Sequence, residues 1–190
     1  MNRRLDCIVC LIGAKGVGKT TTKLQFEKQI FKENYVPNPM EDSYIVLKQV
    51  DGIEVYFILM DESTEYKELT KMIYKNCDCF VFIYSILSID SFNELESFKE
   101  YVLNIKNNEK IVMVLCESKC DLEPQRVVSQ ADGERLALNW NVPFYSCSAR
   151  TRINIDEMFI DVAKQYIKLQ REKKELQTIA AKKKKGCVLV

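Results

Sequence analysis

A glycine-rich stretch near the start of the chain has the residue types and the spacing of a phosphate-binding loop. It reads Gly13-Ala-Lys-Gly-Val-Gly-Lys-Thr20 and satisfies the pattern G-x-x-x-x-G-K-[ST]. Glycine lets backbone N–H groups curl around phosphate oxygens, since no Cβ blocks their approach. Lys19 would reach the β- and γ-phosphates, and the Thr20 hydroxyl would hold Mg²⁺. The predicted phosphate-side residues are Gly13, Ala14, Lys15, Gly16, Val17, Gly18, Lys19, Thr20 and Thr21.

The residues on either side of this loop predict the elements that would hold it. Residues 6–12 are mostly apolar, as in a buried strand. Residues 19–31 have a helical pattern, with Leu24, Ile30 and Phe31 expected to face inward. A helix that begins there would place its positive N-terminal end at the phosphates. A glycine-rich turn without a ligand is the alternative, and this strand–loop–helix context makes it the weaker one.

Further along the chain, apolar runs alternate with helical patterns. Asp51-Gly52 joins two strand patterns and is typical of a tight hairpin turn. Strands that are apolar on both faces and separated by helices predict an α/β fold with a parallel or nearly parallel sheet. The hairpin adds one antiparallel strand at an edge. Further strands are predicted at residues 43–50, 53–60, 78–85, 110–116 and 143–147. Further helices are predicted at residues 66–75, 91–104 and 130–140, with Ser91 to Glu94 as a capping box for the second of these.

A last helix is predicted from about residue 154, where Asn154 to Glu157 would cap it. Its apolar residues recur at helical spacing and predict one buried stripe. The stripe consists of Ile155, Met158, Phe159, Val162, Tyr166, Ile167 and Leu169.

In a parallel sheet, ligands bind at the carboxyl ends of the strands, so chemistry is expected in the turns that follow them. Asp61 directly follows the strand of residues 53–60, and an acid there can hold Mg²⁺, usually through water, opposite Thr20. A lone Asp at a strand end is more often a helix cap or a solvated turn. The phosphate loop in the same chain favours the metal site, with Thr20 and Asp61 as its ligands.

Two later strand ends carry residues that would recognise guanine. Asp121 has an acceptor-only carboxylate, which would accept from the N1–H and the exocyclic amine of guanine, a donor pair that adenine lacks. Lys119 would lay its alkyl stem along the base. The backbone N–H of Ala149 would donate to guanine O6, while the Ser148 hydroxyl braces Asp121. The predicted base-side residues are Ser118, Lys119, Asp121, Leu122, Ser148, Ala149 and Arg150.

Composition and charge fit one globular domain with a basic end. The chain has 190 residues, of which 47% are apolar, and no apolar run reaches the length of a membrane span. No apolar signal follows Met1, so a secreted protein is not expected and the eight cysteines are expected as thiols. Residues 164–190 hold nine basic residues against two acidic ones, although the net charge of the chain is only +1. An acidic body with a basic tail argues against nucleic acid as a partner and for an anionic surface.

Cys7 and Cys10 form a C-x-x-C inside the first predicted strand. Their odd offset places the two side chains on opposite faces, so they cannot act as a pair. A zinc site that combines either of them with Cys77 and Cys79 is the alternative. Core packing is the favoured interpretation, and the chain has no histidine.

The order and spacing of these motifs resemble the Ras family of small GTPases over almost the whole chain. The resemblance is carried by the phosphate loop, Phe31, Tyr35, Glu41 to Tyr44, Asp61, Lys119 to Leu122, Ser148-Ala149 and the last four residues. It implies a P-loop NTPase fold, with a six-stranded, mostly parallel sheet and five helices. It also implies GTP or GDP with Mg²⁺ as cofactors, Phe31 packed against guanine, and effector proteins and an exchange factor as partners. The implied effector-contacting edge is Glu41, Asp42, Ser43 and Tyr44.

The chain departs from the family pattern where the family senses the γ-phosphate. Lys15 stands where the family has a glycine beside the γ-phosphate. By resemblance, a side chain there obstructs the arginine finger of an activating protein and the positioning of water. The alternative is that Lys15 itself adds positive charge at the phosphates. Obstruction is the favoured interpretation.

Both switch segments also lack residues that the family uses. Residues 35–41 are one residue longer than the first switch of the family and lack its threonine, for which Asn38 is the nearest substitute. Residues 61–66 lack the glycine and the water-orienting glutamine of the second switch, and Glu65 would repel the γ-phosphate. Asn38 and Glu65 are the candidates for the lost catalytic roles. Ser118 replaces an asparagine, which costs about one hydrogen bond, or roughly 1 kcal/mol.

The end of the sequence combines a basic run with a Cys-a-a-X pattern. Lys182, Lys183, Lys184 and Lys185 precede Gly186 and Cys187-Val-Leu-Val190, which predicts prenylation of Cys187. One lipid chain anchors marginally, and each lysine near an anionic leaflet adds on the order of 1 kcal/mol. A solvated charged end is the alternative. Val190 fits neither usual rule for the lipid and leans toward geranylgeranyl.

The sequence thus predicts a guanine-nucleotide-binding domain over residues 1–176 and a flexible polybasic tail over residues 177–190. The predicted function is that of a membrane-anchored, Ras-like signalling protein with weak or impaired GTP hydrolysis. Its expected location is the cytoplasmic face of the plasma membrane. The alternative is a non-hydrolysing pseudo-GTPase that acts as a membrane interaction scaffold. A kinase or a motor is disfavoured because the Lys119-x-Asp121 pair selects guanine.

Overall fold

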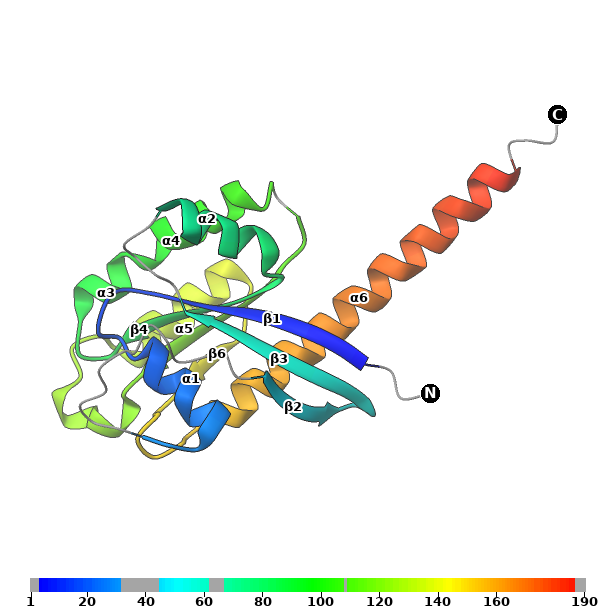
Figure 1. The fold of residues 1–190 in the computed structure, drawn as a ribbon. Helices are drawn as coiled ribbons and strands as arrows, with labels where there is room; N and C mark the ends of the chain where they lie inside the picture. Colours follow the sequence, from blue (N-terminus) through cyan, green and yellow to red (C-terminus); the bar gives the residue numbers. More distant parts are fainter. Residues whose placement is uncertain (1–3, 32–44, 62–66, 108, 187–190) are drawn as a thin grey trace.

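The computed structural model describes residues 4–31, 45–61, 67–107 and 109–186. Six strands form one sheet in the order β2-β3-β1-β4-β5-β6 (Figure 1). Their bounds are β1 (Arg4–Ile12), β2 (Ile45–Val50), β3 (Ile53–Asp61), β4 (Cys79–Ser85), β5 (Val112–Ser118) and β6 (Phe144–Ser146). β2 is antiparallel to β3, and the other neighbouring pairs are parallel. The predicted α/β fold with one antiparallel edge strand is confirmed.

The β2–β3 hairpin has the turn that its sequence predicts. Val50 pairs with Ile53, so Asp51 and Gly52 are the two central residues. Their φ angles are 49° and 73°, and two successive positive φ values define the type I′ turn. This turn matches the twist of the flanking strands and fixes the register of β2 as the edge strand.

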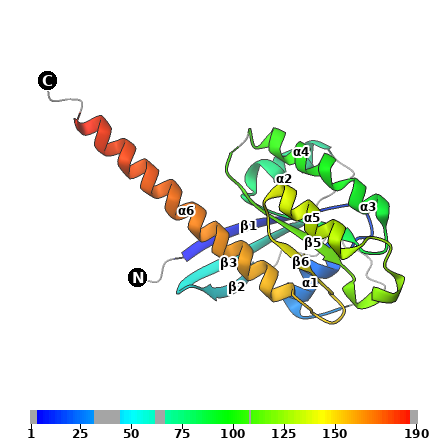
Figure 2. The ribbon, with the colours of Figure 1, turned by 180° about the vertical axis from the view of Figure 1, so that it is seen from behind.

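Helices cover both faces of the sheet (Figures 1 and 2). Their bounds are α1 (Lys19–Lys28), α2 (Lys67–Asn76), α3 (Ile89–Asn93), α4 (Leu95–Ile105), α5 (Gln130–Trp140) and α6 (Ile155–Gly186). On one face, Cys7 of β1 belongs to a core with α1 and α6, in which the rings of Phe26 and Phe159 stack with centroids 4.2 Å apart. On the other face, Cys10 belongs to a core with α2, α4 and α5, which includes Trp140. Cys7 and Cys10 therefore face opposite layers, as predicted.

The first helix is shorter than its sequence pattern suggests. α1 ends at Lys28, and Gln29 caps it in the left-handed region. Leu24 is buried as predicted, but Ile30 and Phe31 are 43% and 37% exposed. The prediction that Ile30 and Phe31 face inward is wrong, because both residues lie beyond the helix and no longer follow its periodicity.

The helix predicted at residues 91–104 is divided into α3 and α4, which gives six α-helices where five were implied. Ser88, not Ser91, is the N-cap of α3: its hydroxyl accepts from the Ser91 backbone N–H at 3.2 Å. The Ser91 hydroxyl instead donates to the Ser88 carbonyl oxygen at 2.7 Å. The predicted capping box is therefore one turn too late, and Glu94 lies between the two helices.

The last helix buries the predicted stripe and then leaves the body of the molecule. The seven residues of the stripe are all buried. α6 continues to Gly186 and projects past the β2–β3 hairpin (Figures 1 and 2). Residues 177–186, predicted as part of a flexible tail, are thus helical in the structure. No helix within the described ranges combines the length and the apolarity needed to cross a bilayer.

Candidate nucleotide-binding site

The phosphate loop joins the carboxyl end of β1 to the start of α1. Gly13, Gly16 and Gly18 have φ angles of 153°, 82° and 106°, which favour glycine. A Cβ at Gly13 would collide with the carbonyl oxygen of Ile83 in β4, whereas a Cβ at Gly16 would meet nothing within 4 Å. The loop is therefore packed against the sheet at Gly13 and open at Gly16, where backbone can approach a ligand closely.

Lys19 supplies a positive charge at the start of α1. It is 9% exposed, and its Nζ donates to the carbonyl oxygens of Gly13 at 2.6 Å and Ala14 at 3.0 Å. A held ammonium group beside a helix N-terminus is a combination that binds anions. Lys15, by contrast, is exposed on the loop. The residues present thus fit a phosphate group.

Side chains from the end of β5 are bonded to this loop. The Ser118 hydroxyl donates to the Val17 carbonyl oxygen at 2.6 Å. Lys119 Nζ donates to the Gly16 carbonyl oxygen at 2.8 Å. The serine that replaces the family's asparagine therefore still forms one hydrogen bond to the phosphate loop, and the predicted base side and phosphate side lie together.

Asp121 and Ser148 meet across the ends of β5 and β6. The Ser148 hydroxyl donates to Asp121 Oδ1 at 2.6 Å and accepts from the Thr151 backbone N–H at 3.1 Å. The predicted brace between these two side chains is thus present, while their contact with guanine stays a prediction. Leu122 and Arg150 flank the pair in sequence.

Gln25 is a site-supporting residue that the sequence patterns did not indicate. Its Nε2 donates at 2.6 Å to the carbonyl oxygen of Ala149, the residue whose N–H is predicted to meet guanine O6. Gln25 is only 5% exposed, and the chain separation of 124 residues hides this contact from any local pattern. A polar residue at an inward position of α1 was the available signal.

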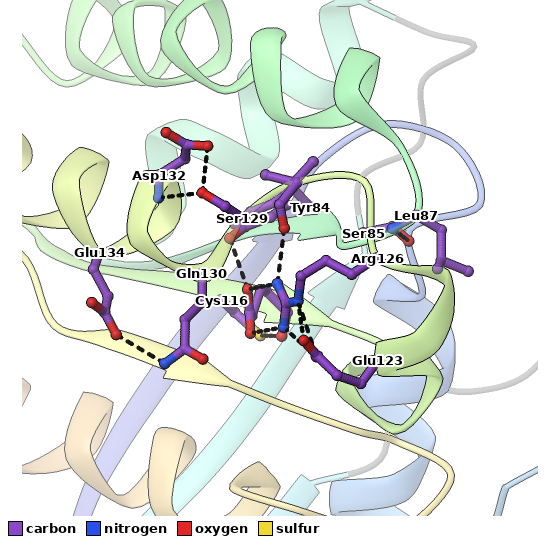
Figure 3. Close-up of polar contacts among 12 residues, drawn as sticks. Tyr84, Ser85, Leu87, Cys116, Glu123, Arg126, Ser129, Gln130, Asp132 and Glu134 are labelled. Carbon is purple, nitrogen blue, oxygen red and sulfur yellow. Dashed lines mark hydrogen bonds and ion pairs between the residues drawn. The ribbon is translucent and has the colours of Figure 1, made fainter.

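A buried ion pair lies beside the base-side residues and was also missed. Glu117 is fully buried and accepts from Arg126 Nη1 at 2.8 Å, from Arg126 Nη2 at 2.9 Å and from the Tyr84 hydroxyl at 3.0 Å. Figure 3 shows the side chains of Tyr84, Arg126 and Glu123 together in this cluster. The signal available in the sequence was a glutamate inside an otherwise apolar strand.

Ionisation in this cluster follows from burial and hydrogen bonding. Burial alone would raise the pKa of Glu117, but hydrogen bonds from Arg126, Ser146 and Tyr84 lower the pKa below its ordinary value. Hydrogen bonds to Glu117 and Glu123 raise the pKa of Arg126. Burial, followed by the charge of Glu117, raises the pKa of Tyr84. The carboxylate and the guanidinium are therefore both charged at neutral pH.

Of the two predicted Mg²⁺ ligands, one lies in the first turn of α1 and the other at the end of β3. Thr20 is the second residue of α1, and Asp61 is the last residue of β3, in register with Leu11 of β1. A hydroxyl and a carboxylate are hard oxygen donors of the kind that Mg²⁺ prefers. The described part of the chain contains no group of three or more His, Cys, Asp or Glu side chains suited to a metal ion, so the cysteine-based zinc alternative finds no support.

Several predicted residues lie outside the described ranges. These are Tyr35, Asn38, Glu41, Asp42, Ser43, Tyr44, Glu65 and Cys187. Phe31 is described and lies three residues beyond the end of α1, partly exposed. A hollow of about 270 Å³ between the amino end of β1 and α6, lined by Arg4 and Arg171 among others, is at the opposite end of β1 from this site.

A comparison with protein-family models supports the same assignment as the geometry. The model of the Ras family matches residues 8–168, which is most of the chain. The match spans the phosphate loop, both magnesium candidates and the base-side residues. The chain therefore belongs to the Ras family, and is a Ras-like small GTP-binding protein.

Proposed function

We propose that the protein is a membrane-associated signalling protein that binds GTP or GDP with Mg²⁺ and hydrolyses GTP weakly or not at all. The observation that carries the proposal is the contrast within one loop. Lys19 is held inside the loop by two backbone carbonyls, while Lys15 projects from it as an exposed side chain. This contrast supports a loop that binds phosphate through Lys19 and carries an additional side chain, Lys15, at the position that the family keeps free.

Nucleotide binding is supported by the connections between the two halves of the site. Ser118 and Lys119 bond to the phosphate loop, and Ser148 bonds to Asp121. Since Lys119 and Asp121 are each held by a partner elsewhere in the fold, little ordering of these two side chains is left for the nucleotide to induce. Thr20 and Asp61 are the residues that would hold Mg²⁺, which would screen the charge of the phosphates.

Impaired hydrolysis follows from the residue types at the γ-phosphate end. Hydrolysis in this family depends on positioned water and on donors to the transferred phosphoryl group. Lys15 obstructs that position, and the sequence lacks the threonine of the first switch and the glutamine of the second. Loss of such groups costs orders of magnitude in rate.

Two other activities fit the same residues. In one, the protein is a regulated GTPase that turns over slowly, with Asn38 or Glu65 in the lost roles. In the other, it is a pseudo-GTPase that stays loaded with one nucleotide and presents Glu41, Asp42, Ser43 and Tyr44 to effector proteins. The two differ in whether bound GTP is ever converted to GDP.

The membrane part of the proposal depends on the end of the sequence. Prenylation of Cys187 together with Lys182, Lys183, Lys184 and Lys185 supplies the two signals that stable anchoring needs. The expected membrane is the anionic cytoplasmic leaflet of the plasma membrane. Cys187→Ser in cells tests this: release to the soluble fraction is expected, and unchanged membrane retention would refute prenylation as the main tether.

The nucleotide content of the purified protein tests the main proposal. The protein is isolated in the presence of Mg²⁺ and denatured, and the released nucleotide is identified by chromatography. GTP at near-stoichiometric amounts is the expected result. GDP together with measurable turnover would overturn impaired hydrolysis, and protein that takes up neither nucleotide would overturn nucleotide binding itself.

A further inference from the structure

Glu117 places a negative charge where no solvent reaches it. It is the penultimate residue of β5 and has 0% relative exposure. Both of its carboxylate oxygens are occupied, by the two terminal nitrogens of Arg126 and by the Tyr84 hydroxyl. Because a buried carboxylate is tolerated only with such partners, these three side chains form one unit.

The Glu117–Arg126 pair joins the two ends of the chain segment that carries Ser118, Lys119 and Asp121. Glu117 directly precedes Ser118, and Arg126 directly follows the 3₁₀ helix η1 (Cys120–Gln125). Arg126 also donates to Glu123 within that helix at 2.8 Å and to the Val128 carbonyl oxygen at 2.9 Å. One guanidinium therefore holds the start, the middle and the end of the segment.

The conformation at Lys119 explains why such a clamp is needed. Lys119 has φ 64° and ψ 32°, a left-handed conformation that costs free energy for a residue with a Cβ. It persists only where surrounding contacts over-determine it. The Cys120 N–H donates to the Cys147 carbonyl oxygen at 3.1 Å, and the Glu117–Arg126 pair holds the same turn from the other side.

We infer that the Glu117–Arg126 ion pair positions Lys119 and Asp121 for base recognition and thereby sets how strongly the protein distinguishes guanine from other purines. The inference rests on the proposed guanine-nucleotide binding. Glu117 and Arg126 are positioning residues that act through Lys119 and Asp121. Tyr84 supports them by completing the hydrogen bonding of the buried carboxylate.

The ratio of affinities for GDP and inosine diphosphate is the direct readout. Inosine lacks the exocyclic amine of guanine, so a well-placed Asp121 loses one of its two donors with that nucleotide. Both affinities are measured by displacement of a fluorescent GDP analogue from the full chain. In Glu117→Gln, GDP affinity is expected to fall about 10- to 100-fold, by analogy with the loss of groups that orient metal ligands. The ratio is expected to narrow toward one.

Asp78→Asn is the matched control. Asp78 also accepts from a tyrosine hydroxyl, that of Tyr166 at 3.1 Å, and lies near a cation, Lys173. It directly precedes β4 and therefore lies at the amino end of that strand, away from the site at the carboxyl ends of the parallel strands. This variant is expected to lower the melting temperature and to leave the ratio unchanged.

Arg126→Lys keeps the charge but loses the forked geometry, so it carries the test if Glu117→Gln does not fold. A narrowed ratio in either folded variant supports the inference. A folded variant that is less stable but keeps the wild-type ratio would overturn it and leave the pair a structural feature only. If the wild-type protein binds neither GDP nor inosine diphosphate, the proposed function is wrong. If the wild-type protein and the variants prefer GDP over inosine diphosphate to the same extent, only the positioning role is wrong.

Discussion

The base end and the γ-phosphate end of the site differ in how their side chains are held. At the base end, Ser118, Lys119 and Asp121 each bond to another part of the protein. At the expected γ-phosphate end, Lys15 is exposed on its loop, and the sequence pattern predicts that the two switch segments lack the family's threonine and glutamine. Under the proposed function, recognition of the nucleotide depends on side chains that the fold already holds, whereas hydrolysis would depend on groups that the sequence pattern lacks.

If the proposed function is correct, this difference means that binding and turnover can change separately within one site. Binding needs donors and acceptors that remain fixed at the ends of β1, β5 and β6. Hydrolysis needs groups aimed at charge that develops in the transition state, and their loss leaves ground-state binding intact. Variants at each end should therefore affect different measurements.

The largest expected effect is at Asp121. Asp121→Asn replaces an acceptor-only carboxylate by an amide whose NH₂ opposes one guanine donor. One hydrogen bond to guanine is lost, and the other is no longer assisted by a negative charge. We expect GDP affinity to fall by at least about 3 kcal/mol, or roughly 100-fold, with a gain for xanthosine diphosphate, whose carbonyl accepts from the amide. Competition binding measures both. Asp132→Asn, in the first turn of α5, is the control. Equal affinity of Asp121→Asn and wild type for GDP would contradict base recognition by Asp121.

The next largest effect is that of Glu117→Gln on the free energy of unfolding, and it should depend on pH. Because the folded-state pKa of Glu117 is lowered, its contribution to stability is full above the unfolded value of about 4.3 and is lost as pH falls through the folded pKa. Glu117→Gln should therefore lower the free energy of unfolding by about 2 kcal/mol at pH 7, and the difference from wild type should shrink below about pH 4. Urea unfolding at several pH values measures this. A pH-independent difference would argue against an ionised Glu117.

A smaller effect is expected at the link between the two halves of the site. Ser118→Ala removes the hydrogen bond to Val17 and leaves that carbonyl without this donor. The expected loss of GDP affinity is about 1 kcal/mol, or roughly fivefold, mainly as faster dissociation. Stopped-flow release of a fluorescent GDP analogue measures it. Ser97→Ala, which removes an exposed hydroxyl contact on α4, is the control, and an equal release rate in Ser118→Ala and wild type would show that the link is not used.

The smallest effect is expected from restoring a single glycine. Lys15→Gly clears the loop, but the switch segments still lack the threonine and the glutamine. Single-turnover hydrolysis should therefore rise by no more than about threefold, or roughly 0.6 kcal/mol of barrier. A rise of several orders of magnitude would show that Lys15 alone blocks turnover. A marked loss of GTP affinity in Lys15→Gly would instead support the alternative in which Lys15 adds charge at the phosphates.

Local sequence signals predicted the elements whose residues determine their own conformation. Asp51-Gly52 specified its turn, the helix at residues 130–140 has the predicted bounds, and the buried stripe of α6 was read from its spacing. The end of α1 was misplaced, because Gln29 adopts a left-handed cap that no proline or glycine announces. The cap predicted at Ser91 lies at Ser88 instead, since both residues offer the same hydroxyl and only the three-dimensional hydrogen bonding separates them.

The supporting contacts of the site were harder to predict than its motifs. Lys19, Lys119 and Asp121 belong to short patterns with a chemical rationale. Gln25 supports Ala149 from a distant part of the chain, and Glu117 with Tyr84 joins two strands. Such contacts depend on strand order, which local patterns do not determine. Charged or polar residues at positions expected to be buried were the only sequence signal for them.

The fate of bound GTP is the most direct test of the separation between binding and hydrolysis. The protein is loaded with GTP and Mg²⁺ and freed of excess nucleotide, and bound GTP, bound GDP and released nucleotide are followed over hours. We expect tightly retained GTP and a hydrolysis rate below about 3 × 10⁻⁵ s⁻¹, a tenth of the intrinsic rate of Ras. Conversion to bound GDP at or above the intrinsic rate of Ras would contradict impaired hydrolysis. Loss of GTP from the protein before the first sample is taken would contradict tight binding.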